Sequence, residues 1–412
     1  MKRENFWVRL SIVNLSAVAF VGMILRSKIV FSLPFIDYNR LLDAHGHFAF
    51  GAWASLSLMF LLVYEVLPES LHSKPVYQWL LAGIALNSWI LLFTYLFVRN
   101  GDLSNFFSTL FIIFTYALSW IFLRDLRKIH VDKAVRLLTV SSLACLILSS
   151  LGTFALAYLF AIKSLNVIFY KDALYTYLHF QYNGFFTLAV FALLFHELES
   201  NISPQSKKNV FRFSILIILS ILPSQFLTYL WQGPNTLFLF IAIAGSVLLL
   251  LSLIWFIISA ISISRVYESR YPTVRFLVIL SMSAFMLKTF LQSFTIFTTV
   301  GNAVFSDRPV IIGFLHLVFL GFVSIFLLAY FSHREFLNIQ NRYTRAALGV
   351  FALGVVFNEV VLMSQGLGAM LVKGSQLFQW LLWIASIWLF VGALMIAINS
   401  VKYSRHANPK AN

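Results

Sequence analysis

The chain is poor in cysteine and in charged residues. Its 412 residues include a single cysteine, Cys145, and only 11% of them are Asp, Glu, Lys or Arg. One cysteine excludes an intramolecular disulfide and a thiolate metal cluster, and no Cys-x-x-Cys-His motif is present to attach haem covalently. Soluble domains carry about 25% charged residues, so the low share excludes an ordinary soluble protein. We find no soluble domain, low-complexity linker or clear internal repeat.

Apolar residues take the place of the missing charge. Hydrophobic residues make up 60% of the chain, and 44 residues are phenylalanine. Apolar runs long enough to cross a ~30 Å hydrocarbon core lie at 8–25, 44–65, 77–98, 104–123, 137–162, 173–197, 211–231, 235–262, 274–298, 309–331, 346–371 and 376–400. We therefore predict an all-α integral membrane protein, in which residues 1–412 form one bundle of twelve transmembrane helices surrounded by membrane lipid. The first run lacks a small-residue cleavage site, so we expect it to be retained.

The basic residues are distributed unequally between the two sides of this bundle. Of the 30 Lys and Arg residues, 21 lie in the tails and loops on the side of both termini, 8 lie on the other side, and Lys288 lies inside a span. By the positive-inside rule, both termini are predicted to be cytoplasmic. The net charge of +15 then reflects topology and anionic lipid headgroups, and we expect no nucleic-acid partner. We predict a multi-pass protein of the cytoplasmic (inner) membrane.

Four of the nine histidines share a depth near the outer ends of three spans. His45 and His47 open the second span, and His179 and His316 lie about seven residues into the sixth and tenth spans. With a rise of about 1.5 Å per residue, all four lie within about 10 Å of the outer boundary. Imidazoles on facing helices are a common way for a bundle to hold haem or a metal. A hydrogen-bonded structural role is the alternative for any one of them.

The order of these histidines resembles that in the catalytic subunit of haem-copper oxidases and nitric oxide reductases. The likeness covers the topology of nearly the whole chain and three short strings, which are Arg40-x4-His45, His179-Phe-Gln-Tyr-Asn-Gly184-Phe-Phe186 and Ile312-Gly-Phe-Leu-His316-x4-Gly321-Phe-Val323. In that family the second-span histidine and one tenth-span histidine bind a low-spin haem, and the sixth-span histidine binds copper. The resemblance therefore implies a subunit I-like bundle with haem as cofactor.

The sequence departs from this family at the oxygen-reducing centre. The position of the family's other tenth-span histidine, which holds the high-spin haem, is Phe314 here. The family's histidine pair on the seventh span is also missing, because that region reads Pro223-Ser-Gln-Phe-Leu-Thr-Tyr229. Of the copper ligands only His179 remains. One imidazole makes a poor copper site, so the sequence does not favour bound copper.

The histidines that are present predict one low-spin haem b. Its iron ligands would be His316 and either His45 or His47, while His179 is kept as a candidate metal ligand. Two residues along a helix differ by about 200° in direction, so only one of the two neighbouring histidines can face His316. The Arg-to-His spacing favours His45, and we expect the other to meet a propionate, Asp43 or the membrane interface.

This interpretation predicts electron transfer, redox sensing or nitric oxide handling, with a quinol or a cytochrome as electron partner and with room for additional subunits. A divergent but active oxidase or nitric oxide reductase is one alternative. A haem-free transporter or channel is the other. Lys288 and Glu359 both lie near the predicted midplane, where a charge needs a partner, so we predict that they pair with each other.

Overall fold

The computed structural model describes residues 3–98, 101–233, 235–264, 271–370 and 375–406. These residues are almost entirely helical, and no strand occurs among them. Twelve continuous helical stretches, some of them made of several consecutive segments, are long and apolar enough to cross a membrane. This confirms the predicted number of spans. In chain order the helices are α1 (Arg3–Val30), α2 (Tyr38–Phe48), η1 (Ala49–Ser55), α3 (Leu56–Leu61), η2 (Leu62–Val66), α4 (Glu69–His72), α5 (Pro75–Phe97), α6 (Gly101–Leu126), α7 (Lys133–Ala161), α8 (Val167–His179), η3 (Phe180–Phe186), α9 (Thr187–Leu198), α10 (Pro204–Gln225), η4 (Phe226–Gln232), α11 (Thr236–Ser264), α12 (Pro272–Phe294), α13 (Thr298–Ser306), α14 (Arg308–His316), η5 (Leu317–Ser324), α15 (Ile325–His333), α16 (Arg342–Met370) and α17 (Gln376–His406).

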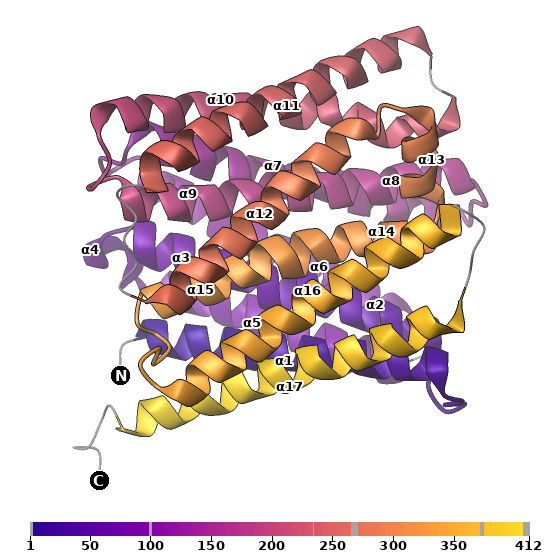
Figure 1. The fold of residues 1–412 in the computed structure, drawn as a ribbon, viewed down its shortest axis with the longest axis horizontal. Helices are drawn as coiled ribbons and strands as arrows, with labels where there is room; N and C mark the ends of the chain where they lie inside the picture. The colour runs from indigo at the N-terminus through magenta and orange to yellow at the C-terminus, as the bar shows by residue number, and fades with distance from the viewer. Residues whose placement is uncertain (1–2, 99–100, 234, 265–270, 371–374, 407–412) are drawn as a thin grey trace.

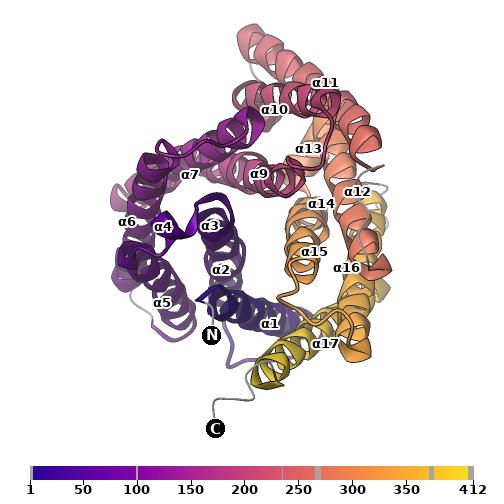
Figure 2. The ribbon, with the colours of Figure 1, turned by 90° about the vertical axis from the view of Figure 1, so that its left-hand side faces the viewer.

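The second, sixth and tenth spans lie inside the bundle. Seen end-on, α3, α9 and α15 are enclosed by a ring that includes α5, α6, α7, α10, α12, α16 and α17 (Figure 2). The most apolar part of the second and of the sixth span is 83% buried, against 22% for the fourth span. In the tenth span this share is 56%, but residues 321–332 are all buried. The interior therefore consists of the spans that carry the four histidines at shared depth. The start of α1 and the end of α17 lie at the same end of the bundle (Figure 1), and the assignment of that end to the cytoplasm remains a prediction from charge.

Each inner span changes to π-helix close behind its histidine. Three π-helical segments follow the histidines: η1 after His47, η3 directly after His179 and η5 directly after His316. A fourth, η2, lies at the other end of the second span. π-Helical turns are rare and are frequently found at functional sites. The sequence gives no sign of them, because the inner spans are apolar on nearly every side and have no polar face whose rotation would reveal a π turn. Their place next to the histidines marks this level of the bundle as specialised.

Side chains satisfy carbonyl groups within these π segments. Asn14 Nδ2 donates to the carbonyl oxygen of Ala52 at 2.8 Å, and Ser281 Oγ donates to that of Phe322 at 2.7 Å. Both donors are fully buried and come from neighbouring spans. In a lipid environment, irregular backbone is tolerated only where protein or water satisfies it. These bonds therefore show why the π segments occur in the inner spans.

At the end where the termini lie, charged side chains join the three inner spans. The Arg334 guanidinium contacts Glu65 Oε2 at 3.0 Å and Glu197 Oε2 at 3.2 Å, and the Glu65 side chain is only 7% exposed. His333 Nε2 lies 3.1 Å from Glu197 Oε1. Burial works against the charge on Arg334, but the two carboxylates outweigh it and raise the pKa of this residue.

Arg334→Gln is expected to lower the free energy of unfolding by about 1–3 kcal/mol, because it leaves the buried Glu65 carboxylate without a cation. Adding Glu65→Gln should restore part of that loss. Thermal unfolding in detergent measures both changes. Arg342→Gln, at an exposed arginine on the same side of the bundle, should have an effect within about 0.5 kcal/mol. Equal losses for Arg334→Gln and Arg342→Gln would show that the contacts with Glu65 and Glu197 contribute nothing.

Candidate functional site

A cavity of about 600 Å³ lies between α1, α2, α14, α16 and α17. We call it the histidine cavity. Its size falls in the range of about 300–1,000 Å³ that is usual for small-molecule and cofactor sites. Its apolar wall includes the side chains of Leu15, Val18, Phe50, Phe319, Phe351 and Leu389. Toward the end where the termini lie, Trp53 Nε1 donates to Ser324 Oγ at 2.7 Å, which links the second and tenth spans.

The cavity brings His45 and His316 together. Both side chains line it, from α2 and from α14. His316 Nδ1 lies 2.8 Å from the carbonyl oxygen of Ile312. A carbonyl can only accept, so Nδ1 carries the hydrogen and Nε2 keeps its lone pair. His45 Nδ1 is buried with no hydrogen-bond partner. The His45 ring lies against Gly22 of α1 and also interacts with the Val18 backbone. The two imidazoles thus line one apolar chamber, and the hydrogen bond of His316 leaves its Nε2 lone pair available.

Gly22 lets the ring of His45 sit close to the backbone of α1. A Cβ atom at this position would lie 3.0 Å from His45 Cε1, which is tighter than ordinary van der Waals contact. A larger residue at position 22 would therefore push the imidazole away from α1. Gly46 also lines the cavity, but a Cβ there would meet nothing within 4 Å. Only the first of these glycines is required by the position of the histidine.

Two arginines and a tyrosine stand at the end of the cavity farther from the termini. Arg26, Arg308 and Tyr38 all line it. The guanidinium of Arg308 lies over the Tyr38 ring, 5.0 Å from its centroid, and donates to the Tyr38 hydroxyl at 2.7 Å. Guanidinium groups bind carboxylates well. The cavity therefore suits an apolar molecule with acidic groups at one end.

His47 faces away from this cavity. Its ring stacks on Tyr95 with centroids 4.7 Å apart and an interplanar angle of 19°, and the Tyr95 hydroxyl lies 3.1 Å from Nε2. The expectation that one of the two neighbouring histidines turns away from His316 agrees with this placement. Its hydrogen-bond partner is Tyr95 of α5 and not Asp43. The residue is exposed, so the expectation that it meets a propionate or the membrane interface stays a prediction.

His179 is held in a separate buried chain of hydrogen bonds. Its Nε2 donates to the carbonyl oxygen of Ile221 at 2.8 Å, and Asn183 Nδ2 donates to its Nδ1 at 3.0 Å. The ring is completely buried. Both nitrogen atoms are occupied, so in this arrangement neither is free to bind a metal. His179 does not line the histidine cavity.

Lys288 continues this chain, and the predicted pair with Glu359 is wrong. Lys288 Nζ donates to Asn183 Oδ1. Glu359 instead accepts from Asn358 Nδ2 at 3.1 Å, and its Oε2 has no hydrogen-bond partner. The two residues match in depth, but they belong to α12 and α16. Depth could be counted along the sequence, whereas the direction of each side chain could not.

No protein-family model matches the sequence, and no curated protein matches it. Within the described ranges, no three His, Cys, Asp or Glu side chains lie close enough together to hold a metal ion. That finding concerns sites built from protein ligands alone. Haem iron takes four ligands from its porphyrin and needs at most two from the protein, so such a site would not be found by this criterion.

Sequence reasoning missed the residues that surround the histidine pair. Arg40, singled out by its spacing to His45, donates from Nε to the carbonyl oxygen of Tyr95 at 3.0 Å and from its guanidinium to that of Val98 at 2.5 Å. Arg40 thus supplies hydrogen-bond donors to the backbone carbonyl groups at the end of α5. The arginines of the cavity are Arg26 and Arg308. The sequence did hold a signal for these two arginines, because both lie on the side of the bundle that has few basic residues.

Proposed function

We propose that the protein binds one haem b in the histidine cavity, with His45 and His316 as the two iron ligands. The observation that carries this proposal is that both imidazoles line one apolar chamber of about 600 Å³. In that chamber, Nδ1 of His316 is engaged by a carbonyl, so the lone pair of Nε2 is available. Six-coordinate haem of this kind would supply one-electron transfer without an open position for substrate.

The charge pattern of the cavity supports the same proposal. Haem carries two propionates on one edge, and the apolar walls of the cavity end at Arg26 and Arg308. Arginine forms strong, directional hydrogen bonds with carboxylates. These two residues would hold the propionate edge, while Gly22 and the Ile312 carbonyl orient the imidazoles.

The likeness to haem-copper oxidases and nitric oxide reductases belongs to this proposal. It is supported by the inner position of the second, sixth and tenth spans and by the pairing of His45 with His316 in one cavity. The hydrogen bonds of His179 and the nearby Lys288 support the view that oxygen chemistry has been lost from the other half of the site. We propose that the protein serves in electron transfer, redox sensing or nitric oxide handling in the cytoplasmic membrane.

An optical spectrum of the purified protein tests the proposal. The reduced-minus-oxidised difference should show the bands of six-coordinate haem b, and carbon monoxide should leave the reduced spectrum unchanged. A shift with carbon monoxide would favour an active oxidase or nitric oxide reductase instead. Protein that is folded, purified from haem-replete cells and free of haem bands would contradict haem binding, and would favour a transporter.

Gly22→Val is expected to reduce the haem content and to change the spectrum of what remains, because the added side chain displaces the His45 ring. The matched control is Gly46→Ala, where a Cβ has open space, and it should bind haem as the wild type does. Haem-to-protein ratio and the low-spin absorbance bands are the measurements. Wild-type bands in Gly22→Val would show that the close approach of Gly22 to His45 has no role in haem binding.

A further inference from the structure

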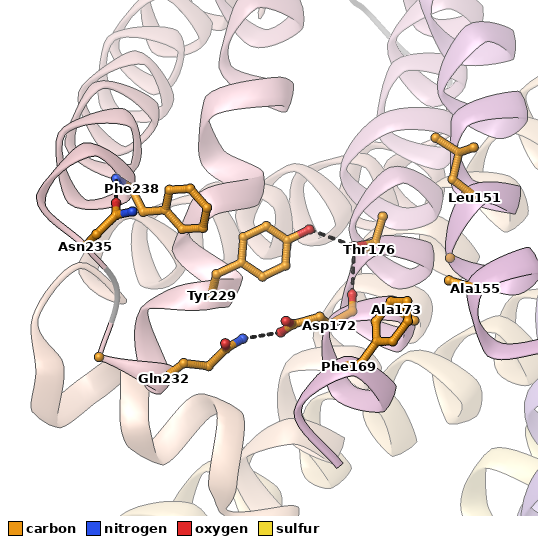
Figure 3. Close-up of a pocket in the computed structure, with 12 residues that line it drawn as sticks. Leu151, Ala155, Phe169, Asp172, Ala173, Thr176, Tyr229, Gln232, Asn235 and Phe238 are labelled. Atoms are coloured by element: carbon orange, nitrogen blue, oxygen red, sulfur yellow. Dashed lines mark hydrogen bonds between the residues drawn. The ribbon is translucent and has the colours of Figure 1, made fainter. Parts of the chain in front are cut away.

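A second cavity, separate from the histidine cavity, opens near the end of the bundle opposite the start of α1. It measures about 450 Å³ and lies between α7, α8, η4 and the beginning of α11. Figure 3 shows its polar side chains, Asp172, Thr176, Tyr229 and Gln232, pointing toward one another. We call it the Asp172 pocket. None of its lining residues lines the histidine cavity.

The hydrogen bonds of the pocket leave an acceptor unused. Thr176 Oγ1 donates to the backbone carbonyl of Asp172 at 2.7 Å, so it must accept the hydrogen of the Tyr229 hydroxyl, which lies 2.8 Å away. The Gln225 amide, whose Nε2 lies 3.4 Å from Thr176 Oγ1, also donates to the Tyr229 oxygen. Gln232 Nε2 donates to Asp172 Oδ1 (Figure 3), which leaves Oδ2 without a donor. A ligand that suits this set must bring hydrogen-bond donors.

The carboxylate of Asp172 also lacks a counter-charge. None of the ion pairs found in the described part of the chain includes Asp172. The neighbouring Lys171 turns its ammonium to the ring of Trp231, 4.5 Å from the centroid. The pocket is thus negative, and it lies close to the end of a membrane span, where an unpaired charge is costly unless a ligand or water meets it.

The remaining walls are aromatic and apolar. The rings of Tyr229 and Phe238 lie 6.3 Å apart at an angle of 44°, and Phe169 and Leu151 complete the wall. Leu151 is 57% exposed and Phe169 39% exposed, so the pocket opens on the outer surface of the bundle. Aromatic faces attract ammonium groups by cation–π interaction, and an exposed apolar rim suits an alkyl chain.

We propose that the Asp172 pocket binds an ammonium group carried on an apolar chain, a site that goes beyond the proposed haem function. Asp172 binds the charge and accepts a hydrogen bond from the ammonium at Oδ2, and the aromatic wall packs on the attached carbons. Two sources share this chemistry. One is the ethanolamine headgroup of a membrane lipid and the other is a free alkylamine.

The proposal is tested by titrating the purified, detergent-solubilised full-length protein with hexylamine and with hexanol. Wild-type protein should bind hexylammonium, with hexanol binding about tenfold or more weakly, because the alcohol lacks the charge. Asp172→Asn keeps an oxygen for Gln232 but loses the charge, and should weaken hexylamine binding to a similar extent. Asp102→Asn, an acidic residue on α6 outside the pocket, should bind as the wild type does. Equal binding of amine and alcohol by the wild type, or undiminished amine binding by folded Asp172→Asn, would overturn the proposal.

Reconstitution separates the two sources. In nanodiscs of phosphatidylethanolamine or of phosphatidylglycerol, hexylamine should bind less strongly in the first if the lipid headgroup is the natural occupant. Native mass spectrometry should then show phosphatidylethanolamine retained by the wild type and lost from Asp172→Asn. Equal binding in the two lipids would identify a free amine as the ligand. Haem bands should persist in Asp172→Asn, so failure of this proposal is distinguishable from failure of the haem assignment.

Discussion

Replacing His316 with alanine is expected to abolish the haem bands of the purified protein. The substitution removes one of two imidazoles that line the histidine cavity, and haem without its second axial ligand is no longer held as a six-coordinate centre. The variant should also unfold more easily, because a ligand present at a hundredfold excess over its Kd stabilises the folded state by about 2.7 kcal/mol. Absorbance, haem-to-protein ratio and thermal unfolding are the measurements.

The matched control is His47→Ala, which removes an imidazole two residues from His45 and outside the cavity. It should retain the haem bands. Added imidazole should restore low-spin bands to His316→Ala, because the deleted side chain leaves room for a free imidazole at the same place. Rescue of this kind distinguishes a lost ligand from a misfolded protein. Wild-type haem content in His316→Ala would exclude His316 as a ligand.

Asn183→Leu is expected to destabilise the protein by about 2–6 kcal/mol, because two buried polar groups lose their partner at a cost of about 1–3 kcal/mol each. Asn183 is the link between His179 Nδ1 and the Lys288 ammonium. Lys288 is 1% exposed, so leucine leaves a buried amine and a buried ring nitrogen without partners. Thermal unfolding in detergent should show a large loss of stability.

The control is Lys288→Met, which replaces the amine by an apolar side chain of similar volume. This change removes the buried amine and leaves only Asn183 Oδ1 without a donor, so we expect a smaller loss of about 1 kcal/mol. The double variant should be more stable than Asn183→Leu alone, since the stranded charge is gone. If Lys288→Met were as damaging as Asn183→Leu, the lysine would have a role that this hydrogen-bond chain does not explain.

Much of the fold could be predicted from the sequence. Length and hydropathy predict twelve spans because a helix must bury its backbone groups and cover the hydrocarbon core, and all twelve occur. The irregular backbone could not be predicted. The π segments of the inner spans depend on donors such as Asn14 and Ser281, which reach across from other helices.

The candidate site was predicted in part. The spacing argument favoured His45 over His47, and the structure places His45 in the cavity with His316. The same reasoning failed for Lys288, which donates to Asn183 instead of meeting Glu359. Counting along an apolar run measures depth, but it does not tell which way a helix is turned or which helices are neighbours.

By itself the sequence determined the number of spans, their order and the level at which the histidines lie, because these depend only on distance along each helix. Only the tertiary structure decided that Gly22 leaves space for the His45 ring and that Arg26 and Arg308 line the same cavity. It also decided that Asp172, without a basic partner, lines a second cavity. These features arise from the rotation and packing of helices distant in the chain. In a bilayer, that packing depends on close contacts and hydrogen bonds between spans, which a one-dimensional pattern of apolar residues does not record.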